Sequence, residues 1–357
     1  MSEAQRRLTR QVRVGDVGIG GQAAIAVQTM TNSDTCDVEA TLAQIRAANA
    51  AGADIVRVAV PNSDAAAALR DIIPDAGVPI VADVHFDYRL AIASAEAGAH
   101  KLRINPGNIG NDERLGAVVE AAGERGIPIR IGVNSGSLEK ELLSKYGHPT
   151  AEALAESAVT NVERIQDMDF ADLVVSLKAS DVRTTVMANR IFAASSDLPL
   201  HVGITEAGIG RAAIVHSAVG IGVLLEEGIG DTLRVSLTGG IVEEVLAGRD
   251  ILLALGLISG PRLVSCPTCG RCQVDNLDAL AAEVGELLVD IDEPLVVAVM
   301  GCEVNGPGEA READVGLAAG RDRATLFARG EIVKTVRMDE ALKALEELIM
   351  QAIVERG

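Results

Sequence analysis

The chain has 357 residues, 48% of them hydrophobic, which is enough for one large domain and a small one. Its 51 Asp and Glu residues outnumber its 32 Lys and Arg residues, and the formal net charge of −19 argues against a protein that binds nucleic acid by neutralising phosphates. The amino-terminal segment is polar, and no apolar stretch is long enough for a signal peptide or a membrane span, so we expect a cytoplasmic protein.

One pattern recurs along the first two thirds of the chain. A short apolar, β-branched run ends in polar residues or glycine, and an alanine-rich helical stretch follows. The expected strands are residues 24–30, 54–59, 79–84, 101–104, 128–133, 173–177, 200–204 and 232–237. The expected helices include residues 37–51, 87–97, 112–125, 150–168 and 181–194, several of which begin with an Asp or Thr suited to an N-cap.

Apolar strands joined by helices predict a parallel sheet that is buried on both faces. Eight such units match a TIM-type (β/α)8 barrel in number and size. An open doubly wound sheet is the alternative, but no Gly-x-Gly-x-x-Gly sequence follows the first strand. The glycine-rich residues 18–21 precede that strand, and we interpret them as a hairpin turn.

The pattern changes near Gly260 and Pro261, which mark a domain boundary. We expect a barrel domain over residues 1–258 and a small α+β domain over 262–357. The elements expected in the second domain are a helix over 277–288, strands near 295–300, 314–317, 325–328 and 332–336, and a final helix over 339–355.

Active sites of (β/α)8 barrels lie at the carboxyl ends of the strands, and polar residues gather there in this sequence. Four of them are cations on separate strands: Arg57, Arg103, Arg130 and Lys178. Arginine binds phosphate oxygens with two parallel hydrogen bonds and lysine acts as a point charge. Any one of these cations could simply pair with a nearby acid, but four on one barrel favour a phosphorylated or diphosphorylated ligand.

Other strand-end residues are candidates for substrate contact or proton transfer. Asp83 and His85 follow the third strand, and Asn134 ends the fifth. Thr205 and Glu206 follow the seventh strand, where Glu206 is a candidate general acid or base, although an N-cap or a salt bridge is nearly as good an interpretation.

Three cysteines of the second domain form a separate constellation. Cys266 and Cys269 are spaced as Cys-x-x-Cys, Cys302 follows at a distance, and Glu309 lies seven residues beyond it. Three thiolates can hold three corners of a 4Fe–4S cluster, and a carboxylate is an exchangeable ligand for the fourth iron. Cys272 offers the alternative of a four-thiolate cluster or a zinc site.

Two segments, residues 266–271 and 301–309, closely resemble the 4-hydroxy-3-methylbut-2-en-1-yl diphosphate synthase family. Residues 27–32, 83–86, 102–108 and 129–136 are also similar to this family, so that the resemblance covers nearly the whole chain. Cys272 is not part of the family pattern, and Cys36 is interpreted as a bystander.

The resemblance implies a 4Fe–4S cluster on Cys266, Cys269 and Cys302, with Glu309 as a replaceable fourth ligand. It implies the two-electron reductive ring opening of 2-C-methyl-D-erythritol 2,4-cyclodiphosphate, with loss of water, to 4-hydroxy-3-methylbut-2-enyl diphosphate. Flavodoxin or ferredoxin would supply the electrons. Family members are homodimers in which the barrel of one chain faces the cluster of the other.

The resemblance also assigns roles to single residues. The substrate contacts that it implies are Arg57, Arg103, Arg130 and Lys178, with Asn134 and His85 nearby. Asp83 and Thr205 are expected to contact the substrate because of their place at strand ends. Glu206 matches a residue thought to assist proton transfer, and Arg262 is the candidate for an arginine that the family places shortly before the first cluster cysteine. The rival from another class is a phosphate-binding barrel with a structural zinc domain and no redox activity.

Overall fold

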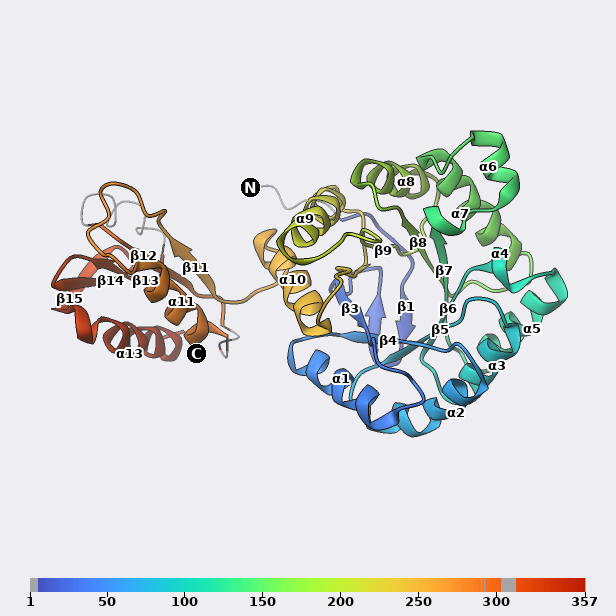
Figure 1. The fold of residues 1–357 in the computed structure, drawn as a ribbon, viewed down its shortest axis with the longest axis horizontal. Helices are drawn as coiled ribbons and strands as arrows, with labels where there is room; N and C mark the ends of the chain where they lie inside the picture. The colour runs from blue at the N-terminus through green and yellow to red at the C-terminus, as the bar shows by residue number, and fades with distance from the viewer. Residues whose placement is uncertain (1–5, 290, 292, 303–312, 357) are drawn as a thin grey trace. The chain divides into compact units, whose positions relative to one another are not determined.

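The computed structural model describes residues 6–289, 291, 293–302 and 313–356. The chain divides into two compact units, Met1–Leu255 and Gly256–Gly357, which are described separately below (Figure 1). None of the described helices is long and apolar enough to cross a membrane.

The first unit is the predicted barrel, a ring of parallel strands surrounded by helices (Figure 1). Its strands are β3 (Ala26–Met30), β4 (Ile55–Ala59), β5 (Ile80–Asp83), β6 (Lys101–Ile104), β7 (Ile129–Asn134), β8 (Leu173–Lys178), β9 (His201–Val202) and β10 (Thr232–Leu233). The sheet order is β8-β7-β6-β5-β4-β3-β10-β9, and a bridge between Val175 and Leu200 joins its two edges. The (β/α)8 prediction is therefore confirmed, and the doubly wound alternative is wrong.

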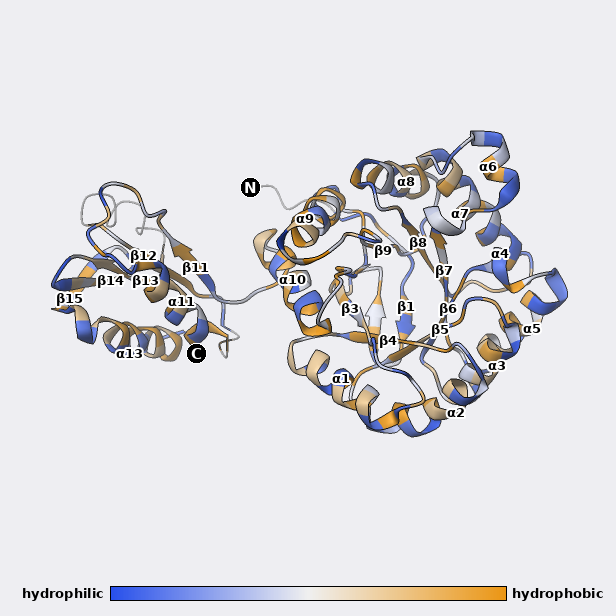
Figure 2. Cartoon of the chain, viewed as in Figure 1, coloured by the Kyte–Doolittle hydropathy of each residue, from blue (hydrophilic) through white to orange (hydrophobic). Residues whose placement is uncertain are grey.

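Helices connect successive strands, and most of them bury apolar side chains, whereas α6 has no buried residue. Hydrophobic and hydrophilic residues alternate along these helices (Figure 2). They are α1 (Val38–Ala50), α2 (Ser63–Ile72), α3 (Tyr88–Glu96), α4 (Pro106–Ile109), α5 (Asp112–Glu124), α6 (Lys140–Tyr146), α7 (Ala151–Gln166), α8 (Val182–Ser195), α9 (Gly210–Glu226) and α10 (Ile241–Ala254). The expected caps are present: the side chains of Asp37, Thr150 and Asp181 accept backbone hydrogen bonds in the first turns of α1, α7 and α8.

A hairpin of β1 (Val12–Val14) and β2 (Val17–Ile19) closes the amino-terminal end of the barrel. Val12, Val14 and Ile19 share one buried cluster with residues at the starts of the strands, among them Ile55 and Val81. The predicted turn was misplaced, because the chain reverses at Gly15, whose φ of +61° suits glycine, whereas Gly18 lies within β2.

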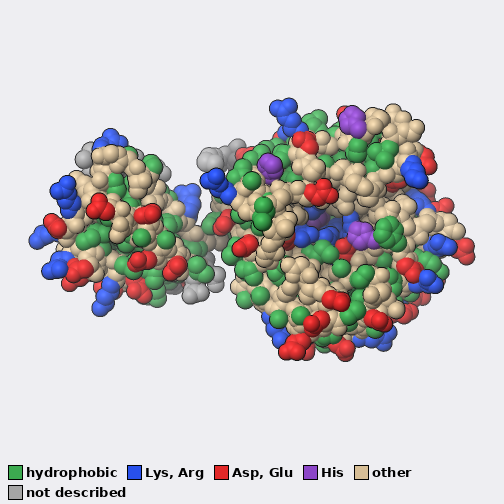
Figure 3. Space-filling model, viewed as in Figure 1, with side chains coloured by type: hydrophobic (Ala, Val, Ile, Leu, Met, Phe, Trp, Pro, Cys, Tyr) green, Lys and Arg blue, Asp and Glu red, His purple; other side chains and the backbone are tan. Residues whose placement is uncertain are grey.

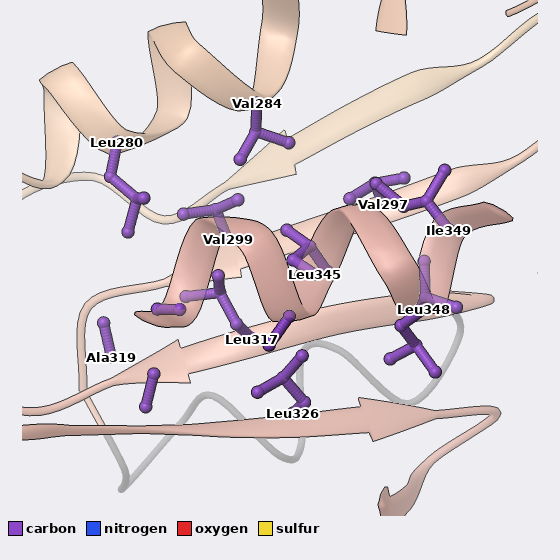
Figure 4. Packing of buried hydrophobic residues seen from close by; sticks show 14 of the residues in the cluster. Leu280, Val284, Val297, Val299, Leu317, Ala319, Leu326, Leu345, Leu348 and Ile349 are labelled. Atoms are coloured by element: carbon purple, nitrogen blue, oxygen red, sulfur yellow. The ribbon is translucent and has the colours of Figure 1, made fainter. Parts of the chain in front are cut away.

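The second unit is a five-stranded sheet covered by helices α11 (Leu277–Leu288) and α13 (Ala341–Val354). Its strands, in sheet order, are β11 (Arg262–Ser265), β12 (Val296–Met300), β13 (Val315–Ala319), β14 (Arg323–Ala328) and β15 (Glu331–Arg337). Side chains from both helices, such as Val284 and Leu345, meet Val297, Val299 and Leu317 of the sheet in one core (Figure 4). The prediction did not include β11, which pairs in parallel with β12.

Candidate active site

The four predicted cations gather at the carboxyl-terminal end of the barrel, which is called the mouth below. Arg57 lies on β4, Arg103 on β6, Arg130 on β7, and Lys178 ends β8. Lys and Arg side chains fill the hollow at the centre of the barrel face (Figure 3). Because adjacent parallel strands point the same way, residues scattered over more than a hundred positions in sequence share one small volume.

Asp83, at the end of β5, is the acid around which two of these cations are arranged. Arg103 Nη1 donates to Asp83 Oδ1 over 3.1 Å, and Arg57 Nε lies 3.8 Å from Oδ2. His85 Nε2 lies 3.4 Å from Oδ2 and 3.1 Å from Arg103 Nη1, with half of its side chain exposed. Burial alone would raise the pKa of Asp83, but Arg57, the hydrogen bond with His85 and Arg103 together hold it well below its usual range.

Arg57 has little besides Asp83 to balance its charge. Its guanidinium donates to the sulfur of Met30, from Nη2 over 2.9 Å and from Nε over 3.1 Å. Burial, opposed by Asp83, lowers the pKa of Arg57 to about 10. A thioether is a weak acceptor, so this guanidinium keeps most of its capacity to bind a stronger one.

A glycine makes room for the guanidinium of Arg103. A Cβ atom placed on Gly132 of β7 would lie 2.4 Å from Arg103 Nε and 2.6 Å from Nη2. Asn134, at the end of the same strand, accepts from Arg103 Nη2 over 3.0 Å when its amide is oriented to satisfy both of its polar atoms. Arg103 is thereby fixed between β5 and β7.

Arg130 and Lys178 lie deeper. Arg130 is fully buried, and its Nη1 donates to Gln28 Oε1 over 3.0 Å. The ammonium of Lys178 lies against Gly203, where a Cβ atom would come within 2.8 Å of Nζ. Burial is the main cause that lowers the pKa of both groups, followed by the neighbouring cations. An anion placed among these groups would relieve their mutual repulsion.

Arg234 is a further mouth residue that the sequence analysis did not name. It follows β10 directly, and its guanidinium donates to both carboxylate oxygens of Glu244, over 3.0 and 2.9 Å. Thr29 also donates to Glu244. The sequence did contain a signal for this residue: Arg234 is a lone arginine inside the apolar run 232–237 that was expected to form the last strand.

Three further predicted residues lie apart from this cluster in the sequence. Thr205 and Glu206 lie in the loop between β9 and α9, where Glu206 is exposed and adopts a positive φ of 53°. Among the hydrogen bonds and ion pairs of the described barrel residues, none joins the Glu206 side chain to another predicted site residue. Arg262 begins β11 in the second unit with an exposed side chain. The roles of all three residues stay predictions.

The cysteines of the second unit lie near the ends of two adjacent parallel strands. Cys266 follows β11 and Cys302 follows β12 after one residue, with Ser265 opposite Val299. The backbone N–H of Gly301 donates to Cys266 Sγ over 3.2 Å, the type of bond that tunes a cluster thiolate. Cys269 is exposed, and a backbone hydrogen bond from Arg271, aided by that side chain, lowers the pKa of its thiol.

The donor set fits a thiolate-bound cluster in its chemistry, although the thiols are not closed around one point. Within the described residues, no three metal-ligating side chains gather closely enough to hold a metal ion. Glu309, the fourth predicted ligand, lies outside the described residues. The ligand set therefore stays a prediction.

Cys272 packs against the hydrophobic core of the second unit. Its Sγ donates to the carbonyl of Val274 over 3.3 Å, and a Cβ on Gly301 would come within 2.6 Å of it and 2.7 Å of Leu277 Cδ2. Leu277 belongs to the core between the sheet and its helices, so Cys272 lies on the helix-covered face. Cys36 is exposed in the barrel unit, with Asn62 Oδ1 3.9 Å from its sulfur.

Comparisons with solved structures show the barrel fold alone. A type I 3-dehydroquinate dehydratase from Clostridium difficile matches 70% of this chain and 100% of its own with a TM-score of 0.50 at 11% identity. A dihydropteroate synthase from Coxiella burnetii matches 70% of this chain and 98% of its own with a TM-score of 0.50 at 13% identity.

Sequence comparisons cover nearly the whole chain and show its family. Curated proteins named 4-hydroxy-3-methylbut-2-en-1-yl diphosphate synthase (flavodoxin) are 55% identical in Geobacter sulfurreducens, over 98% of this chain and 99% of the relative, and 53% identical in Caldanaerobacter subterraneus, over 97% and 99%. The model of the GcpE TIM-barrel domain matches residues 9–249, and that of the GcpE protein C-terminal domain matches residues 262–351. The chain therefore belongs to the GcpE family.

Proposed function

We propose that this protein is a 4-hydroxy-3-methylbut-2-enyl diphosphate synthase, an oxidoreductase of the non-mevalonate isoprenoid pathway. It would open the ring of 2-C-methyl-D-erythritol 2,4-cyclodiphosphate with two electrons and a proton, and release water. The observation that carries the proposal is the match of both family domains to this chain, at up to 55% identity with the relatives described above.

The mouth of the barrel supplies the binding chemistry for a diphosphate. Among the described residues, Asp83 is paired with two of the four cations, Arg57 and Arg103. The second acid of the mouth, Glu244, already holds Arg234 in a two-pronged ion pair. The excess of positive charge would be offset by the phosphoryl oxygens. Two guanidinium groups that are fixed by Asp83 and by the space over Gly132 are already oriented before the substrate arrives, which lowers the entropic cost of binding.

Proton transfer is assigned to exposed groups at the same end. The reaction consumes a proton as the departing oxygen becomes water, so a donor must reach that oxygen. Glu206 is proposed for this role because it lies in the loop that follows β9 and adopts a constrained backbone conformation. His85, between Asp83 and Arg103, is proposed as a substrate contact.

Cys266, Cys269 and Cys302 would hold a 4Fe–4S cluster, with Glu309 as the exchangeable ligand. When bound, the cluster supplies single electrons and a Lewis-acidic iron. The relatives' name specifies flavodoxin, and we propose flavodoxin, or a ferredoxin in its place, as the electron donor here. Free thiolates of this kind are maintained in the cytoplasm, which is the proposed location.

Metal analysis tests this proposal directly. Protein purified without oxygen should be brown, contain about four irons per chain and convert the cyclic diphosphate when reduced flavodoxin is supplied. Glu309→Ala should keep the thiolate ligands but weaken turnover or cluster stability. A colourless protein with about one zinc per chain would support a structural zinc domain instead.

We also propose a homodimer. An apolar surface on the barrel helices α9 and α10 supports it, since Val215, Val219 and Leu246 are about half exposed there. Leu246 also lines a hollow of about 420 Å³ between the two helices, together with Ile214, Ala218 and Ile251 among others. Apolar area of this kind on a folded unit is typical of a protein interface.

A further inference from the structure

A second polar layer includes Arg130, one of the four cations, and extends from it toward the closed end of the barrel. It consists of Gln28, Lys101, Arg130, His201 and Thr232, and is called the polar floor here. Each comes from a different strand of the barrel, and each is at most 1% exposed. Lys101 precedes Arg103 by two residues on β6, so its backbone lies about 7 Å closer to the closed end of the barrel, on the same face of the strand.

The polar floor has more hydrogen-bond donors than acceptors. Within the part of the chain that the structure describes, Gln28 Nε2, Lys101 Nζ, Arg130 Nε and His201 Nε2 are buried without a hydrogen-bond partner. Two internal contacts are made, from Arg130 to Gln28 and between His201 Nδ1 and Thr232 Oγ1 over 2.7 Å. Buried polar atoms are normally paired, so this deficit calls for an explanation.

Lys101 stands out because it is a fully buried amine for which the described residues provide no ion-pair partner. The hairpin cluster seals the barrel below it, and its strand neighbour Val81 belongs to that cluster. The charged and titratable groups that face the barrel interior around and above it come from all the other elements of the site: Arg57, Asp83, Arg103, Arg130, Lys178, His201, Arg234 and Glu244. The two acids are already paired with Arg103 and Arg234, respectively.

We propose that Lys101 is a positioning residue of the diphosphate subsite, uncharged in the ligand-free barrel and protonated when a diphosphate binds above it. The proposal rests on the function proposed above. Lys101 would take up one proton when the diphosphate binds, and the resulting ammonium would offset part of the diphosphate's negative charge.

The physical argument compares the two states of the mouth. Without an anion, burial and the positive charges of Arg130 and Arg57 lower the pKa of Lys101 well below its ordinary value. A diphosphate reverses the sign of the nearest field, so the charged form of Lys101 becomes the favoured one. By linkage, a group whose pKa rises on binding takes up a proton, and the affinity it supports decreases as the pH rises through its two pKa values.

Isothermal titration calorimetry of the full chain with inorganic pyrophosphate tests this inference. Heats measured in buffers of different ionisation enthalpy give the number of protons taken up, from about pH 6 to about pH 10. Wild-type protein should take up about one proton more per bound pyrophosphate than Lys101→Met at the pH of maximal uptake, since the ligand's own protons cancel in the difference. The substitution should weaken binding about tenfold there.

Two further variants make the result specific. Methionine fills the space of a buried lysine without a charge, so Lys101→Met should fold at least as stably as the wild type. His201→Gln should retain the extra proton, which separates Lys101 from the other titratable group of the polar floor. Lys145→Met, at an exposed lysine paired with Glu156, is the matched control and should leave both affinity and proton uptake unchanged.

The outcomes separate this inference from the proposed function. Tight binding of pyrophosphate with equal proton uptake by wild type and Lys101→Met would overturn the role of Lys101 and leave the diphosphate site standing. Loss of the extra proton in His201→Gln alone would assign the proton to His201 and overturn the inference as well. Failure of the wild-type protein to bind pyrophosphate would overturn both.

Discussion

At the scale of single residues, the mouth of the barrel depends on the absence of side chains as much as on their presence. Arg103 can lie over β7 only because Gly132 has no Cβ, and a Cβ on Gly203 would clash with the carbonyl oxygen of Arg234 and crowd Lys178 Nζ. Gly132 lies within a regular strand, so glycine is not needed there for a turn. Glycine there serves the close approach of a charged group.

Gly132→Ala should therefore displace the Arg103 guanidinium from its contacts with Asp83 and Asn134. Affinity for inorganic pyrophosphate should decrease about tenfold, the loss expected when one charge-assisted hydrogen-bonding group is misplaced. Calorimetric titration measures it. Gly116→Ala in α5 is the matched control, because a Cβ there meets nothing within 4 Å; equal losses in the two variants would contradict the steric account.

The second prediction concerns how the carboxylate of Asp83 contributes to the stability of the fold at low pH. Asp83→Asn leaves buried cations without their counter-ion and should destabilise the protein by about 3 kcal/mol at neutral pH. Because the folded-state pKa of Asp83 is depressed, its contribution is complete above about pH 4 and decreases as the pH falls below that value.

Urea unfolding of both proteins at a series of pH values measures this difference. The gap in unfolding free energy between wild type and Asp83→Asn should be constant above about pH 4 and become smaller below it. Asp71→Asn, at an exposed position of α2, provides the control. A gap that widened in acid would show that Asp83 does not stabilise the fold as a carboxylate.

At the scale of elements, the sequence predicted helices and strands that have a regular apolar pattern. It missed features that depend on pairing with a strand distant in the sequence. The eight barrel strands and α11 were found because buried strands and amphipathic helices leave regular apolar patterns. Strand β11 was missed because its four residues are only partly buried and are held by pairing with β12, some thirty positions further along the chain. For the same reason Arg234 and Lys101 were overlooked: the inward direction of a strand residue follows from the register, which the sequence does not state.

The hairpin β1–β2 is an element whose value is purely architectural. It places Ile19, which is fully buried, against the amino-terminal ends of the barrel strands. Ile19→Ala should reduce the unfolding free energy by about 3 kcal/mol, since it removes buried methyl groups and leaves a cavity under the polar floor. Arg13→Ala, on the exposed side of the same hairpin, should change it by less than about 0.5 kcal/mol in the same denaturation experiment. Equal effects would mean that the hairpin does not seal the barrel.

At the scale of the whole molecule, the distribution of charge is more informative than its total. Although the chain has a net charge of −19, Lys and Arg side chains fill the hollow at the centre of the barrel face, and Asp and Glu side chains lie around the edge of that face (Figure 3). A cationic mouth of this kind would attract the small diphosphate substrate that we propose. The exposed apolar side chains of α9 and α10 form the surface that we propose for association.

That surface gives the last prediction, which concerns assembly. Light scattering on a sizing column should give twice the chain mass of 37.0 kDa for the wild-type protein. Val215→Lys combined with Val219→Lys places two charges, one helical turn apart, on the apolar face of α9, and should convert the dimer to a monomer because a buried unpaired ammonium is costly in an interface. Met187→Lys, at an exposed methionine on α8, should leave the dimer intact. A double variant that stays dimeric would move the interface elsewhere, and a monomeric wild type would refute the homodimer.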